Sequence, residues 1–72
     1  LANYEKALPL LEEINGKYNR KEENTKIMEI LGFVYYKLNR IEDAKNVWSE
    51  VLKLDPNNNK IKNNLKILNE RV

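Results

Sequence analysis

The side chains able to do chemistry in this chain lack the partners that catalysis needs. The sequence holds no histidine and no cysteine, so the commonest general base and the thiolate nucleophile are both absent. Ser49 and Thr25 carry hydroxyl groups, but neither has a histidine to accept its proton. Adjacent carboxylates occur at residues 12–13 and 22–23, and neighbouring positions of a helix do not face each other. We therefore expect no catalytic residue and no enzyme activity.

Metal and cofactor sites are equally poorly supported. Asp55, Asn57 and Asn59 alternate like the first ligands of a calcium loop. However, Lys60 replaces the glycine that the loop requires, and Lys66 replaces its closing glutamate. The glycines are isolated, so the chain has no glycine-rich phosphate loop. The sequence therefore predicts neither a metal nor a cofactor.

The composition is that of a small helical domain. Apolar residues make up 42% of the 72 residues and charged residues 33%, with a net charge of only +2. No apolar run approaches the roughly 20 residues that a membrane span needs. The N-terminus shows no signal-peptide pattern. The first residue is Leu1 and not an initiator Met, so we expect the chain to be part of a longer protein. The lack of cysteine leaves the compartment open, and an intracellular location is the simpler expectation.

Apolar residues recur at a spacing of three or four in four segments, which predicts an all-α chain of about four helices. Asn3 is a candidate N-cap of the first helix, and Asn24 or Thr25 of the second. Pro9 removes a backbone donor, which predicts a kink or a later start of the first helix. Pro56 ends the third helix. The expected helices cover about residues 3–14, 24–38, 41–54 and 59–71.

Residues 25–58 resemble one complete tetratricopeptide repeat, a helical hairpin of about 34 residues. Met28 and Trp48 stand where the repeat has Trp and Phe, and the other signature positions match. Gly32 and Ala44 are small, which is required where paired helices approach closely. The residues that carry the resemblance, and that we expect in the core, are Met28, Leu31, Gly32, Tyr35, Ala44, Trp48 and Pro56.

The flanking segments resemble partial repeats, so residues 1–72 are predicted to form a single tetratricopeptide-like domain of stacked antiparallel hairpins. Residues 1–24 correspond to the second helix of an upstream repeat and a linker, with Ala7 in the place of Ala44. Residues 59–72 correspond to a following first helix. Lys66 and Asn69 replace its Gly and Tyr, so we expect a polar capping helix there.

The resemblance implies a protein–protein interaction module with a scaffold or adaptor role. Arrays of this family bind peptides or protein segments on a concave face that is lined by the first helix of each repeat. The resemblance implies that Phe33 and Tyr36 lie on that face, although they could instead pack against the first helix or an upstream helix. Glu29 and Phe33 occupy places where the carboxylate clamp of chaperone-binding members has Lys and Asn, so we do not expect that ligand. The candidate peptide-binding residues are Lys26, Glu29, Phe33, Tyr36 and Lys37.

Two alternatives remain. The first helix lacks its hairpin partner, so Leu8, Leu10 or Leu11 could form a homo-oligomer contact. Nucleic-acid binding is the weaker alternative because the net charge is close to neutral. It would depend on two basic segments. The C-terminal helix carries Lys60, Lys62, Lys66 and Arg71. The linker before the second helix carries Lys17, Tyr18, Arg20 and Lys21.

Overall fold

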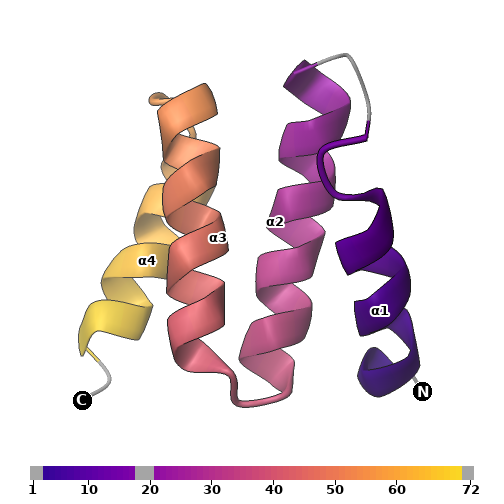
Figure 1. The fold of residues 1–72 in the computed structure, drawn as a ribbon. Coiled ribbons are helices and arrows are strands. Elements are labelled where there is room, and N and C mark those ends of the chain that lie inside the picture. Colours follow the sequence, from indigo (N-terminus) through magenta and orange to yellow (C-terminus); the bar gives the residue numbers. More distant parts are fainter. Residues whose placement is uncertain (1–2, 18–20, 71–72) are drawn as a thin grey trace.

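The computed structural model describes residues 3–17 and 21–70, which form four α-helices (Figure 1). They are α1 (Tyr4–Ile14), α2 (Lys21–Lys37), α3 (Ile41–Leu54) and α4 (Asn59–Glu70). Successive helices run in opposite directions, and α2 lies between α1 and α3. The described residues contain no strand, so the all-α prediction is confirmed. None of their helices is long and apolar enough to cross a membrane.

The helix ends follow from local residue chemistry. Asn3 caps α1, because its side-chain oxygen accepts a hydrogen bond from the Lys6 amide at 3.1 Å. Helix α1 therefore begins directly after Asn3 in spite of Pro9, and the alternative of a later start is wrong. Gly16 has a φ of 83°, which favours glycine just after a helix. Helix α3 ends at Leu54, ahead of Pro56 as predicted.

Helix α2 begins at Lys21, so the prediction that Asn24 or Thr25 caps it is wrong. Thr25 lies inside the helix, where its hydroxyl donates to the Lys21 carbonyl at 2.7 Å. The hydroxyl thus bonds to the preceding helical turn instead of to a free amide. Glu22 and Glu23 in the first turn favour this longer helix, because carboxylates stabilise the positive end of the helix dipole.

The core is built from two clusters on either side of α2. Leu8, Leu31 and Val34 pack between α1 and α2. Leu8 is only 8% exposed, so its predicted place on an exposed oligomer surface is wrong. The second cluster lies between α3 and α4, with Tyr36 and other partly buried side chains of α2 packed on it. Its buried members are Ala44, Trp48, Val51, Ile61 and Leu68.

The repeat-signature residues fall mainly in this interior. Leu31, Gly32, Ala44 and Trp48 are buried. Met28 and Tyr35 are half-buried, whereas Pro56 is exposed in the turn between α3 and α4. Pro56 thus ends a helix without taking part in the core.

Candidate functional site

An apolar groove runs between α2 and α4, and α3 forms its floor. The hollow has a volume of about 180 Å³. Phe33 and Ile67 stay 44% and 53% exposed although both are large and apolar. The groove therefore presents apolar surface to solvent, which is the usual mark of a binding surface. Its lining residues are Phe33, Tyr36, Trp48, Asn64, Ile67 and Leu68.

Trp48 on α3 is held in the floor of the groove by α2. Its indole Nε1 donates to the Glu29 carbonyl at 3.1 Å. The ring lies against Gly32, where a Cβ would overlap the indole. The absence of a side chain at Gly32 therefore lets the indole pass α2 and reach the groove.

Phe33 forms a ridge at the edge of the groove. Its ring packs edge-on against Tyr4 of α1, with 5.9 Å between the centroids. The Lys37 ammonium lies 5.4 Å from the Phe33 centroid, within the range of a cation–π contact. Phe33 thus combines both alternatives raised by the sequence, since it packs on the preceding helix and also lines the groove.

One end of the groove is polar and internally paired. The Glu29 carboxylate accepts a hydrogen bond from the side-chain amide (Nδ2) of Asn58 at 2.8 Å. The same carboxylate pairs with the Lys60 ammonium at 2.9 Å. A second hollow of about 290 Å³ lies between this pair and Phe33, and it also includes Trp48. Glu29 therefore holds the start of α4 against α2, and its charge is largely balanced within the chain.

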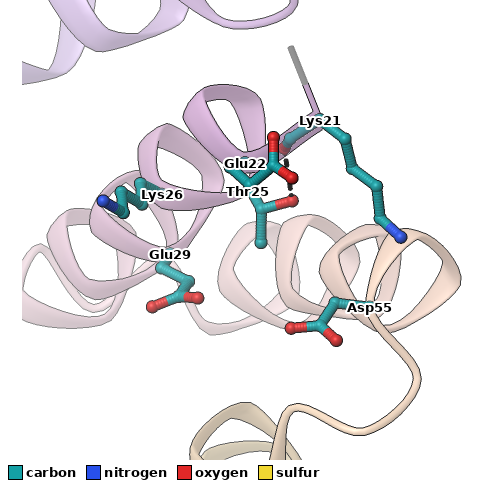
Figure 2. A pocket seen from close by; sticks show the side chains of 6 residues that line it. All are labelled: Lys21, Glu22, Thr25, Lys26, Glu29 and Asp55. Atoms are coloured by element: carbon teal, nitrogen blue, oxygen red, sulfur yellow. Dashed lines mark hydrogen bonds between the residues drawn. The ribbon is translucent and has the colours of Figure 1, made fainter.

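Lys26 lies away from the apolar groove, in a polar hollow of about 310 Å³. Figure 2 shows its six lining side chains, which come from the first turns of α2 and from Asp55 before α4. Charges of both signs alternate there and no large apolar side chain is present. The hollow is therefore less suited to anchoring a peptide than the groove. Its residues are Lys21, Glu22, Thr25, Lys26, Glu29 and Asp55.

The structure thus brings together some of the five residues that the sequence nominated. Phe33 and Tyr36 share the groove, Glu29 borders it, and Lys37 reaches it through the Phe33 ring. Sequence reasoning missed Trp48, Asn64 and Ile67 as groove residues. Ile67 could have been recognised from the sequence, because it is a large apolar residue outside the apolar stripe of α4 and is therefore expected to be exposed. The contribution of Trp48 and Asn64 depends on how three helices meet, which no single-helix pattern shows.

The proposed basic surfaces are partly engaged elsewhere. Lys60 pairs with Glu29, which reduces the positive charge of α4. Tyr18, Arg20 and Arg71 lie outside the described residues. Within the described parts of the chain, no group of three or more carboxylate, histidine or cysteine side chains could hold a metal ion.

Tyr35 joins α1 to α2 behind the groove. Its hydroxyl donates to the Glu12 carboxylate at 2.5 Å. Burial, and then this hydrogen bond, raise the pKa of Tyr35 to about 12. The Arg40 guanidinium stacks 4.7 Å from the centroid of the same ring. Tyr35 therefore connects α1 to α2 as a neutral phenol. These packing contacts account for a tyrosine at this position of the repeat.

Comparisons with known proteins agree with this architecture. No curated protein and no solved structure gave a match. The family model of the prolyl 4-hydroxylase peptide-substrate-binding domain matches residues 2–72, nearly the whole chain. This match confirms the tetratricopeptide resemblance and the role of a peptide- or protein-binding module. The chain belongs to the family of prolyl 4-hydroxylase peptide-substrate-binding domains.

Proposed function

We propose that the chain holds an extended peptide or protein segment in the groove between α2 and α4. The observation that carries the proposal is the exposure of Phe33 and Ile67 on a hollow floored by Trp48. Large apolar side chains with a few polar neighbours are typical of peptide-binding clefts. Asn64 supplies a polar neighbour, since an amide both donates to and accepts from a peptide backbone.

The family description suggests the class of ligand. A domain of that name binds the peptide substrate of a prolyl hydroxylase, and such a peptide contains proline. Proline-rich segments adopt an extended helix in advance and dock on aromatic-lined grooves. Phe33, Tyr36 and Trp48 supply aromatic rings of that kind. A proline-rich peptide is therefore the first ligand to test.

The same proposal gives the chain a scaffold or adaptor role and no catalytic step. The absence of histidine and cysteine supports a binding role without catalysis, because binding needs neither residue. Any reaction on the bound peptide would take place in a separate domain or protein. Nucleic-acid binding is not favoured, since the groove is lined mostly by apolar side chains.

A fluorescence titration tests this function. Trp48 is the only tryptophan, so its emission reports directly on the groove floor. We expect a proline-rich peptide to change this emission in a saturable way, and Phe33→Ala to weaken binding by about tenfold. Lys26→Ala is the matched control, because Lys26 lies in the separate polar hollow. No saturable change with peptides of any composition would contradict the proposal.

A further inference from the structure

The groove between α2 and α4 contains two hollows that differ in charge. The hollow of about 180 Å³ is lined by aromatic and aliphatic side chains and by Asn64. The neighbouring hollow of about 290 Å³ includes the ion pair of Glu29 and Lys60. Phe33, Trp48 and Asn64 line both hollows, so the two are continuous along the groove. A peptide that fills the apolar hollow therefore also passes a charged one.

The two partners of this ion pair differ in what they can still bind. Both oxygens of Glu29 are engaged, since one accepts from the Asn58 side-chain amide and the other lies 2.9 Å from the Lys60 ammonium. The Glu29 side chain is only 19% exposed, whereas the Lys60 side chain is 71% exposed. An ammonium group has three N–H donors. Lys60 can therefore bind a further carboxylate while it keeps Glu29, whereas a cation from a ligand would compete for a carboxylate that is mostly covered.

A second cation lies at the rim of the groove. Lys37 is exposed, and its ammonium lies 5.4 Å from the centroid of the Phe33 ring. Among the described residues that line the two hollows, Glu29 is the single carboxylate. One carboxylate thus stands against the two ammonium groups of Lys60 and Lys37. Complementary charges select between partners, so this excess of positive charge favours an acidic peptide over a basic one.

We propose that the peptide held in the groove carries an acidic side chain, which the Lys60 ammonium binds while a neighbouring residue fills the apolar hollow. This inference rests on the function proposed above and adds the charge of the ligand. Glu29, the partner of Lys60, lies four and seven residues before Phe33 and Tyr36, or about 6 and 10 Å along α2. An extended proline-rich peptide covers this length in about two or three residues. The acidic residue is therefore placed at that spacing from the residue in the apolar hollow.

Three proline-rich peptides that differ only in one central residue, Glu, Gln or Lys, test the inference. Their ends are blocked, so that the central side chain carries the only charge, and the emission of Trp48 reports the binding of each. We expect the Glu peptide to bind about two- to fivefold more tightly than the Gln peptide, which is the contribution of an exposed ion pair. The Lys peptide should bind no more tightly than the Gln peptide. Added salt should reduce the difference between the Glu and Gln peptides.

Substitution of Lys60 identifies the residue that reads the charge. Lys60→Gln should abolish the preference for the Glu peptide over the Gln peptide. Each variant is titrated with both peptides, so any loosening of α4 affects both dissociation constants and cancels in their ratio. Lys62→Gln is the matched control, because it removes the same charge from an exposed position of α4 that lines neither hollow. The preference should remain in this control.

The outcomes separate the acidic specificity from the binding function itself. Equal affinities for the three peptides, tighter binding of the Lys peptide, or a preference that survives Lys60→Gln would overturn the inference and leave the peptide-binding groove in place. A lack of saturable binding by all three peptides would instead contradict the proposed function, and the acidic specificity with it.

Discussion

The Trp48 indole occupies the space that a side chain at Gly32 would fill. A Cβ built on Gly32 would overlap Nε1, Cδ1 and Cε2 of the ring. The same Nε1 donates to the carbonyl of Glu29, one turn earlier on α2. This one contact therefore sets the distance between α2 and α3 and also the position of the groove floor.

Gly32→Ala should destabilise the chain although alanine is the better helix former by about 1 kcal/mol. The added methyl group forces the Trp48 ring or the helix to move, and overpacking of this kind costs about 1 to 3 kcal/mol. Urea unfolding followed by circular dichroism would measure the loss. Asn46→Ala on the exposed side of α3 is the control and should not lower stability. An equally stable Gly32→Ala chain would show that the contact is loose.

Tyr35 should make stability depend on pH in the alkaline range. Its pKa is raised from 10.0 to about 12 in the folded chain, by burial and then by the hydrogen bond to Glu12. The folded state thus holds the hydroxyl proton more tightly than the unfolded state does. The corresponding stabilisation is complete below pH 10 and is lost as the pH rises through about 12.

Spectrophotometric titration of tyrosinate, combined with unfolding at several pH values, checks this dependence. Tyr35→Phe should remove the late-titrating group and cost about 1 kcal/mol at neutral pH, because the hydrogen bond to Glu12 is lost. Tyr4→Phe keeps the edge-on contact with Phe33 and serves as the control. If Tyr35 titrated at its ordinary pKa of 10.0, the described link between α1 and α2 would be wrong.

Asn58→Ala should loosen the start of α4 by removing two hydrogen bonds at once. Asn58 accepts from the Ile61 amide at 3.1 Å and donates to Glu29 at 2.8 Å. Losing a cap of this type costs about 1 kcal/mol. Amide hydrogen exchange should therefore become faster in the first turn of α4. Asn57→Ala is the control, because Asn57 is exposed in the connection between α3 and α4, and it should leave this exchange unchanged. Equal protection in both variants would argue against the cap.

The helices could be predicted from the sequence because apolar spacing and end signals act within one segment. Asn3 and Pro56 mark helix ends that the structure confirms. The start of α2 was misjudged for a local reason. Thr25 has two uses for its hydroxyl, as a cap or as a donor to the preceding turn, and its residue type does not decide between them.

The groove was only half predictable, because it depends on where helices meet. Spacing placed Phe33 and Tyr36 on one face of α2. It could not show that Glu29, on the same face, is engaged by Asn58 and Lys60 from beyond the next helix. For the same reason Leu8 was predicted as exposed, although α2 covers it.

Amide chemical-shift mapping with a bound proline-rich peptide tests the central claim most directly. We predict that the shifts concentrate on Phe33 and Tyr36 of α2 and on Asn64 and Ile67 of α4, together with the Trp48 indole N–H. The amide chemical shifts of Lys26 and its neighbours should not change, because the polar hollow there lies outside the groove. Shifts gathered instead around that hollow, or on the exposed side of α3, would contradict the account.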